Sequence, residues 1–326
     1  MESPGIFESR VKLNDLQTAI DKIRAEIGKI VVGQHDMVDL LITAIFSNGH
    51  VLLEGVPGVA KTLTAKLVAR SINTSFSRIS FTPDLMPSDV IGSLIYNAKT
   101  TEFEFRKGPV FSNIVLADEI NRAPAKTQSA LFEAMEEHQV TVDGKTHLLP
   151  SPFMIVATQN PIEHEGTYRL PEAQLDRFLF KVKVDYPTKE QEISMLTGYH
   201  TRNNLNDIKT INPVLSASEV QDFQQRVRSI HIEPNLIGYI SDIIQNTRRN
   251  KALYLGASPR AAIAILTASK AYAAVNGRDF VTPEDIQYIA YPVLRHRIML
   301  TAEKEMEGLH ADDIIKQIIQ GIEVPR

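Results

Sequence analysis

The chain has 326 residues, of which 43% are hydrophobic, so it is long and apolar enough for two domains with real cores. Its formal net charge of -4 argues against a general nucleic-acid binder, because such domains usually carry a surplus of basic residues. The absence of cysteine excludes disulfides, thiolate metal sites and cysteine nucleophiles.

The amino-terminal segment, residues 1–10, has neither the basic flank nor the apolar stretch of a secretory signal. No uncharged stretch of the sequence is long enough to cross a bilayer. We therefore expect a soluble, cytoplasmic protein without a membrane span.

A helical leader is predicted first. Residues 13–30 carry apolar side chains at helical spacing, and a second helical segment covers 37–46. An apolar turn that contains Gly33 separates them. This turn either packs as part of an ordinary pair of helices or covers a ligand bound at the loop that follows.

That loop is rich in glycine and lies between the apolar run 50–54 and a helix-prone segment from Leu63 to Ile72. Strand, glycine loop and helix in this order are typical of a phosphate-binding P-loop, in which backbone amides and the helix N-terminus surround phosphate oxygens. Lys61 would bridge the β- and γ-phosphates of ATP, and the Thr62 hydroxyl would coordinate Mg²⁺. Ala60 replaces the glycine of the strict pattern, so it needs a backbone that an L-residue tolerates. A chance glycine-rich turn is the alternative.

In the P-loop interpretation, the turn at Gly33 would cover the adenine. The residues expected to contact the nucleotide are Gly33, Gly55, Val56, Pro57, Gly58, Val59, Ala60, Lys61, Thr62 and Leu63.

Two hairpins are predicted beyond the P-loop helix and a strand at 76–81. The first pairs 93–96 with 102–105. The second pairs 139–142 with 145–148 around Asp143-Gly144, a strong signal for a two-residue turn. Such added surface either has a use of its own or only packs on the core.

Between the hairpins, four apolar residues at 114–117 run into Asp118 and Glu119, which is typical of a buried parallel strand. Ligands of open α/β sheets bind at the carboxyl ends of strands, so this pair would face the P-loop. Asp118 could then hold the magnesium shell and Glu119 could polarise the attacking water. The alternative is a strand that ends in solvated acids.

A further strand, 153–158, leads to Asn160, which could orient the lytic water, although Asn-Pro is also a common turn signal. The last core strand is predicted at 178–184. After Pro187 helix-start signatures replace strand patterns, so the expected domains are 1–187 and an all-helical 188–326. Arg260 begins a helix, where cations are disfavoured, so it is either a solvated charge or the partner of an anion such as a nucleotide phosphate.

Together these motifs resemble the MoxR-type AAA+ ATPases, a helix-2-insert clade related to magnesium chelatase subunits. The segments that carry the resemblance cover most of the chain and are 55–62, with its alanine before the lysine, 116–123, 157–161, 172–178 and 256–260.

The resemblance implies an α/β fold, a P-loop doubly wound parallel sheet, with a C-terminal all-α lid domain. It implies Walker A roles for Lys61 and Thr62, Walker B roles for Asp118 and Glu119, and a sensor 1 role for Asn160. It also makes Arg177 the arginine finger and Arg260 sensor 2. The two hairpins are similar to the family's helix-2 and pre-sensor-1 inserts. Arg169 departs from the family pattern, which has proline there, and this leaves the contacts of its loop open.

The same resemblance implies ATP and Mg²⁺ as cofactors, and a ring, usually a hexamer, with nucleotide bound between subunits. It further implies chaperone-like work on client protein complexes, with a partner that carries a von Willebrand factor A domain. Two other functions are weighed against this one. A nucleic-acid motor of the MCM type is disfavoured by the acidic balance. A nucleotide-gated scaffold without turnover is disfavoured by the retained Glu119 and Arg177.

Overall fold

The computed structural model describes residues 13–161, 168, 170–201 and 208–325. They form two compact units, one of Ile23–Gln221 and one of the segment up to Lys22 together with Asp222–Arg326. Arg169, whose departure from the family pattern was noted above, lies outside the described residues.

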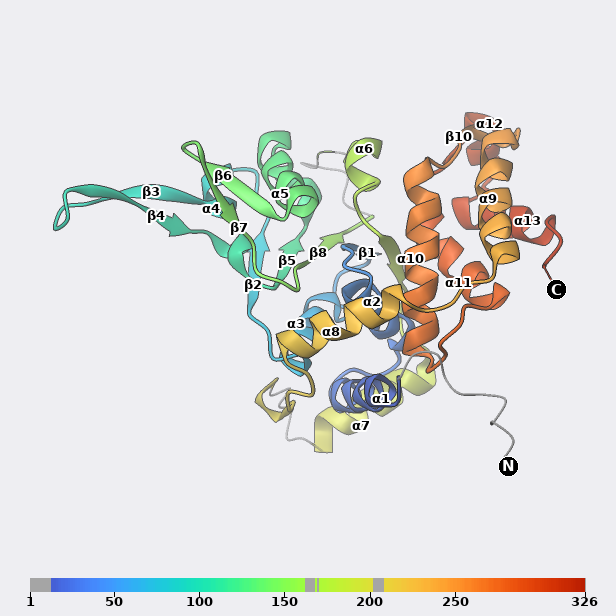
Figure 1. The fold of residues 1–326 in the computed structure, drawn as a ribbon, viewed down its shortest axis with the longest axis horizontal. Coiled ribbons are helices and arrows are strands. Elements are labelled where there is room, and N and C mark those ends of the chain that lie inside the picture. Colours follow the sequence, from blue (N-terminus) through green and yellow to red (C-terminus); the bar gives the residue numbers. More distant parts are fainter. Residues whose placement is uncertain (1–12, 162–167, 169, 202–207, 326) are drawn as a thin grey trace, which may run out of the picture. The chain divides into compact units, whose positions relative to one another are not determined.

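The first unit is built on a parallel sheet of five strands in the order β2-β5-β8-β1-β9 (Figure 1). In chain order the strands are β1 (Val51–Gly55), β2 (Phe76–Ser80), β5 (Ile114–Asp118), β8 (Met154–Gln159) and β9 (Phe180–Val184). Each neighbouring pair is parallel, for example with Leu52 opposite Ala157 and Leu116 opposite Val156. The predicted doubly wound α/β fold is therefore confirmed.

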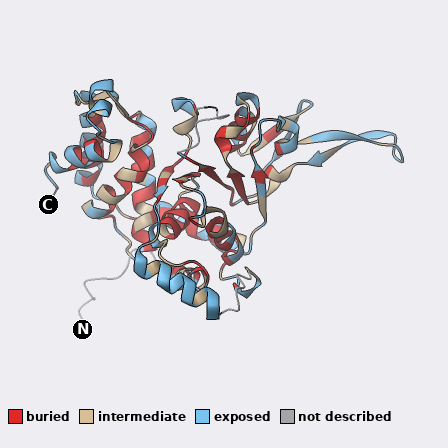
Figure 2. Cartoon of the chain, turned by 180° about the vertical axis from the view of Figure 1, so that it is seen from behind, coloured by how far each residue is buried: buried red, intermediate tan, exposed pale blue. Residues whose placement is uncertain are grey.

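Helices cover both faces of this sheet, which explains the nearly continuous apolar runs of the central strands. Helices α2 (His35–Phe46) and α3 (Lys61–Ser71) lie on one face, and α5 (Ala125–Glu137) lies on the other (Figure 1). Leu52, Val115 and Ala117 are fully buried in the core that includes α5 residues. The sheet is accordingly the most deeply buried part of the unit (Figure 2).

Six further elements of the described residues complete the unit. They are α4 (Pro87–Ile91), η1 (Pro109–Phe111), η2 (Ile120–Arg122), α6 (Glu172–Leu175), α7 (Lys189–Thr201) and η3 (Ile208–Thr210). The two boundaries between the units fall within helices, one in α1 (Asn14–Gly28) and one in α8 (Ala217–Arg228).

Both predicted hairpins are present. The first, β3 (Gly92–Asn97) with β4 (Glu102–Lys107), is long and exposed (Figure 2). The second joins β6 (Gln139–Val142) to β7 (Lys145–Leu148). Asp143 and Gly144 have φ values of 51° and 72°, the pair of positive angles that a two-residue hairpin turn of type I′ requires.

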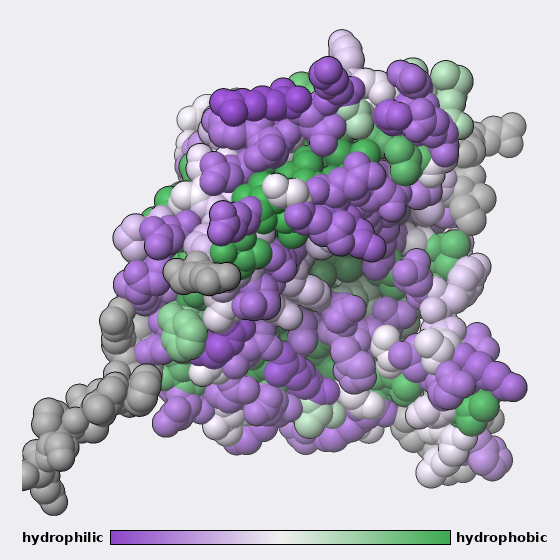
Figure 3. Space-filling model, turned by 90° about the vertical axis from the view of Figure 1, so that its right-hand side faces the viewer, coloured by the Kyte–Doolittle hydropathy of each residue, from purple (hydrophilic) through white to green (hydrophobic). Residues whose placement is uncertain are grey.

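The second unit is helical, as predicted. Its helices are α9 (Pro234–Arg249), α10 (Pro259–Val275), α11 (Pro283–Leu294), α12 (Ala302–Met306) and α13 (Ala311–Gln320). Alanines of α10 such as Ala268 and Ala271 are fully buried. Seen from the side in Figure 3, the surface is mainly hydrophilic, with hydrophobic residues in bands between the polar ones.

This unit also contains a small antiparallel ladder, β10 (Leu253–Leu255) with β11 (Met299–Leu300), which the sequence did not predict. Strands of three and two residues are too short to show an alternating pattern.

The sequence divides the chain after Pro187, where strands give way to helices, whereas the compact units divide it at residues 22 and 221. Residues after Pro187 pack on the sheet unit. Val214 N–H, for instance, donates to Ser71 O at 2.6 Å, and Ile211 is fully buried. The domain boundary at 187 stays a prediction.

Within the described ranges, no helix combines the length and the apolar character that a membrane crossing requires. The cytoplasmic location stays a prediction.

Candidate nucleotide site at the strand ends

The glycine loop joins β1 to α3 at the carboxyl edge of the sheet, as the P-loop interpretation requires. Gly58 has a φ of 90°, a conformation that favours glycine. At Gly55 an added Cβ would lie 2.4 Å from Val184 O. Any other residue at position 55 would therefore keep β9 from approaching β1 this closely. The Lys61 ammonium donates to Gly55 O and so lies back over the loop.

Ala60 occupies the left-handed region, with φ 62° and ψ 17°, at the N-cap of α3. An L-residue tolerates this conformation, as expected for Ala60, but adopts it less readily than glycine does. This conformation costs an alanine roughly 1–2 kcal/mol relative to the right-handed region, and such strain is common at functional sites. The glycine of the strict P-loop pattern would occupy the same conformation without that cost.

Asp118 and Glu119 lie at the end of β5 and share a partner on the neighbouring strand β8. The Thr158 hydroxyl donates to Asp118 Oδ1 at 2.6 Å and accepts from the Glu119 N–H at 2.9 Å. Glu119 itself is left-handed, with φ 56°, and this turns it out of the line of the strand. One buried hydroxyl thus fixes both acids at the edge where the P-loop begins.

Each of the two acids also has an arginine partner. Arg78 on β2 donates to Asp118 Oδ2 from Nε at 3.0 Å and from Nη2 at 2.5 Å. Arg122 Nη1 lies 2.8 Å from Glu119 Oε2. Sequence reasoning missed Thr158, Arg78 and Arg122 as site residues. Two weak signals of a site were available in the sequence. Thr158 is a polar residue near the end of an apolar strand, and Arg78 is a charged residue in an alternating strand.

Asn160 directly follows β8 and is 8% exposed. In the sheet order β8 lies between β5 and β1, so Asn160 follows the strand that separates the two acids from the P-loop. Asn160 therefore lies at the carboxyl edge of the sheet, and its role in orienting a water stays a prediction.

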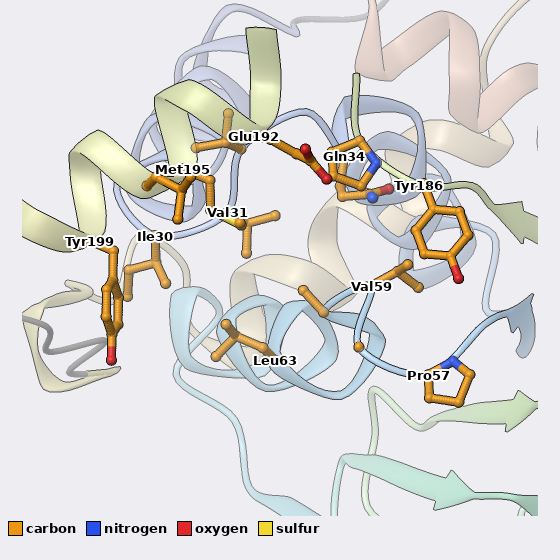
Figure 4. Close-up of a pocket in the computed structure, with 15 residues that line it drawn as sticks. Ile30, Val31, Gln34, Pro57, Val59, Leu63, Tyr186, Glu192, Met195 and Tyr199 are labelled. Atoms are coloured by element: carbon orange, nitrogen blue, oxygen red, sulfur yellow. The ribbon is translucent and has the colours of Figure 1, made fainter. Parts of the chain in front are cut away.

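A cavity of about 530 Å³ adjoins the P-loop. Its lining comes from the leader turn, from the P-loop and α3, and from α7 (Figure 4). The labelled side chains of Ile30, Val31, Leu63 and Met195 point into it, so the lining is largely apolar (Figure 4). Such a cavity suits a flat, apolar group like a purine base beside a phosphate loop.

The leader turn thus lies beside the P-loop, as the adenine hypothesis expects. Gly33 itself has a φ of 79°, and an added Cβ would meet the Gln191 side chain at 2.4 Å. Gln191 accepts from Thr188 N–H at 2.9 Å at the start of α7, so Gly33 allows the turn and α7 to pack closely. Its neighbours Val32 and Gln34 line the cavity. A nucleotide contact by Gly33 stays a prediction.

Arg177 is held on α5 and not on the P-loop. Its Nη1 donates to Phe132 O at 2.6 Å, and its Nη2 lies 2.7 Å from Glu136 Oε2. Arg260 belongs to the helical unit, where it is exposed in the first turn of α10. The structure thus does not group Arg177 with the acids, and a nucleotide contact by Arg260 stays a prediction.

The donor set fits Mg²⁺ held partly by a nucleotide. Among the described residues, no group of three or more histidines and carboxylates could hold a metal by itself. Mg²⁺ in phosphate-transfer sites usually keeps waters and takes only one or two protein oxygens besides the substrate phosphates. Thr62 in the first turn of α3 and Asp118 at the end of β5 would supply these oxygens.

A parallel sheet with a P-loop and two strand-end acids at its carboxyl edge defines the class of P-loop ATPases. Residues 50–180 match the family described as ATPase family associated with various cellular activities (AAA), and residues 245–318 match the AAA lid domain.

Similar proteins narrow the class. The chain is 48% identical to the uncharacterized protein YeaC of Bacillus subtilis, over 95% of this chain and 96% of that protein. It is 43% identical to the chaperone MoxR1 of Mycobacterium tuberculosis, over 92% of this chain and 81% of that protein. A crystal structure from Cytophaga hutchinsonii, provisionally assigned as an ATPase, superposes with a TM-score of 0.88 at 42% identity, covering 96% of this chain and 97% of that one. The chain belongs to the MoxR family of AAA+ ATPases, as its sequence motifs predicted.

Proposed function

We propose that this chain binds Mg-ATP at the carboxyl edge of its sheet, hydrolyses it, and uses the reaction to remodel client protein complexes. One observation carries the proposal: Thr158 bonds to both Asp118 and Glu119 at the edge where β1 enters the P-loop. A metal-holding acid and a water-activating acid beside a phosphate loop are the groups that phosphoryl transfer to water needs.

Each residue has a definite role in this proposal. Lys61 exchanges the Gly55 carbonyl for phosphate oxygens, and Thr62 and Asp118 hold the metal. Glu119 exchanges Arg122 for the attacking water, which Asn160 helps to orient. The bound metal would neutralise charge on the phosphates. The residues of the chain bind the nucleotide and orient the attacking water.

The proposed active unit is a ring, usually of six subunits. Arg177 lies on α5, bound to Glu136 and to a helix carbonyl, so its guanidinium is not directed at its own P-loop. In the proposal it reaches the nucleotide of the neighbouring subunit, where a planar guanidinium can neutralise the transferring phosphate. Arg260, at the start of α10, acts as the lid's contact with the nucleotide.

The hairpins are the proposed contact with clients or with a partner that carries a von Willebrand factor A domain. The long hairpin exposes large apolar side chains to solvent, with Tyr96 53% and Phe103 69% exposed. Exposed aromatic side chains on a projecting element suit a binding surface better than a support for the core. In the second hairpin, β6–β7, the turn residues Asp143 and Gly144 are exposed. Shortening this turn should spare the melting temperature and change partner-stimulated turnover.

Phosphate release by the purified protein tests the reaction. We expect Mg-dependent release from ATP, no ATP binding by Lys61→Ala, and binding without turnover by Glu119→Gln, because the amide keeps the shape of the side chain but not its basicity. Unchanged hydrolysis by a folded Glu119→Gln would exclude the assigned role of that residue. No hydrolysis by the wild type, alone or with a partner, would exclude the reaction.

A further inference from the structure

Arg78 binds the carboxylate of Asp118, which is the metal ligand in the proposed site. Two of its guanidinium nitrogens donate to the same oxygen, Asp118 Oδ2, at 3.0 and 2.5 Å. The other oxygen, Oδ1, accepts from the Thr158 hydroxyl at 2.6 Å. Both oxygens of the acid are thus bound by groups of the protein.

The sheet places Arg78 there by register. On β2, Arg78 lies opposite Leu116 of β5, and Ser80 lies opposite Asp118. Side chains two residues apart on a strand share a face, so Arg78 and Asp118 project from the same face of neighbouring strands. The Arg78 side chain is 54% exposed whereas that of Asp118 is 15% exposed, so the arginine can leave its partner more easily than the acid can.

The charge balance has a consequence for metal binding. Without nucleotide, Arg78 neutralises the carboxylate that we assign to the metal, and a divalent cation that approaches it meets the positive charge of the guanidinium. With nucleotide, the phosphates bring several negative charges to the same edge, and these outweigh one guanidinium.

We propose that Arg78 is an internal counter-cation of Asp118, which keeps free divalent cations out of the nucleotide-free site so that Mg²⁺ enters together with the nucleotide. This inference rests on the proposed function, since it takes Asp118 to be the metal ligand. The alternative is a purely structural role, in which Arg78 only ties β2 to β5.

Mn²⁺ binding without nucleotide, followed by electron paramagnetic resonance, separates the two roles. We expect Arg78→Gln to bind Mn²⁺ about tenfold more tightly than the wild type, because a unit charge a few ångströms from a divalent cation is removed. Arg78→Lys keeps the charge and should stay close to the wild type. Arg70→Gln makes the same change in net charge at the exposed far end of α3 and should also leave the affinity unchanged.

The double variant Arg78→Gln/Asp118→Asn locates the gained affinity, which should disappear if Asp118 is the ligand. Equal Mn²⁺ affinity in the wild type and a folded Arg78→Gln would overturn the inference. Should Arg78→Gln fail to fold, Arg78→Met, which keeps the aliphatic stem, is measured instead with the same expected result.

Thermal melting gives a second readout. Removal of Arg78 leaves Asp118 without its cation, so the melting temperature of Arg78→Gln should fall and then recover as MgCl₂ is added. The wild type should respond little. A loss of stability that MgCl₂ does not restore would indicate the structural role.

These measurements do not depend on hydrolysis. Tighter Mn²⁺ binding by Arg78→Gln in a protein that releases no phosphate would support the inference and overturn the proposed reaction. Normal phosphate release with unchanged Mn²⁺ binding would overturn the inference alone.

Discussion

The two edges of the central sheet both contain buried polar residues, but these residues have different kinds of partners. At the amino edge, His50 Nε2 donates to Met135 O at 3.0 Å, and Ile155 N–H donates to His50 Nδ1 at 3.0 Å. Asn113 similarly joins Ser75 to Pro152 O. Most of these partners are backbone groups.

At the carboxyl edge the polar residues bind mainly to other side chains. Asp118 pairs with Arg78 and Thr158, Glu119 pairs with Arg122, and all but Thr158 are partly exposed. Side chains can exchange partners, whereas backbone carbonyls and amides of a sheet cannot do so without unfolding it. Changes at the amino edge should therefore alter stability, and changes at the carboxyl edge should alter turnover.

The largest effect is expected outside both edges, at Arg177. Replacing it with alanine should lower turnover on the order of 10³- to 10⁵-fold while leaving nucleotide binding intact, because an arginine supplied in trans stabilises the transferring phosphate. Mixing Arg177→Ala with Lys61→Ala protomers tests this: mixed rings should regain activity that neither variant has alone. Mixtures that stay inactive despite verified co-assembly would exclude a shared site.

At the carboxyl edge, Thr158→Val should lower turnover on the order of 10- to 100-fold, since both acids lose the hydroxyl that positions them. The loss of stability should be modest, about 1–3 kcal/mol, for the buried groups left unpaired. Thr158→Ser keeps the hydroxyl and is the matched control. Steady-state phosphate release and urea unfolding are measured on all three proteins, and equal turnover in Thr158→Val and the wild type would contradict the positioning role.

At the amino edge the expected effect is on stability and depends on pH. Burial lowers the pKa of His50 to about 4, from an ordinary value of 6.5, because the charged ring would lose its hydration and could no longer accept from Ile155 N–H. Between these two values the unfolded chain binds the proton and the folded chain does not. The stabilisation is therefore complete above pH 6.5 and is lost as the pH falls towards 4, by about 2 kcal/mol at pH 5.

Urea unfolding at pH 7 and pH 5 measures this loss. His50→Gln should have a lower free energy of unfolding than the wild type at pH 7. Between pH 7 and pH 5, however, this free energy should fall less in the variant than in the wild type. Its turnover per folded molecule at pH 7 should match the wild type. An equally steep pH dependence in the variant would assign the acid sensitivity to other groups.

The smallest effect is expected at Ala60, where the P-loop backbone is left-handed. Ala60→Gly should raise the free energy of unfolding by up to about 1 kcal/mol, since relief of the strain exceeds the entropy gained by the unfolded chain. Ala60→Val should destabilise the protein instead, because a β-branched residue tolerates this conformation less. A stable Ala60→Val with unchanged ATP affinity would show that the loop relaxes to another conformation.

The sequence by itself determined the fold class, the P-loop, the strand that ends in Asp118 and Glu119, both hairpins and the helical unit. These features depend on local signals in the sequence. Apolar residues recur every two positions in strands and nearly every four in helices, and glycines and helix-start residues mark the ends of elements. Continuous apolar runs are typical of strands that helices cover on both faces of a sheet. The family followed from the same motifs, because their order and spacing are specific.

Only the tertiary structure decided which side chains meet at the strand ends. Arg78 reaches Asp118 across 40 positions of sequence, and Thr158 reaches the same acid across another 40. These contacts depend on the order β2-β5-β8 and on the register of parallel strands, and no local pattern encodes either. The placement of Arg177 on α5 could not be predicted for the same reason, because it depends on contacts with Phe132 and Glu136, which lie far from Arg177 in the chain.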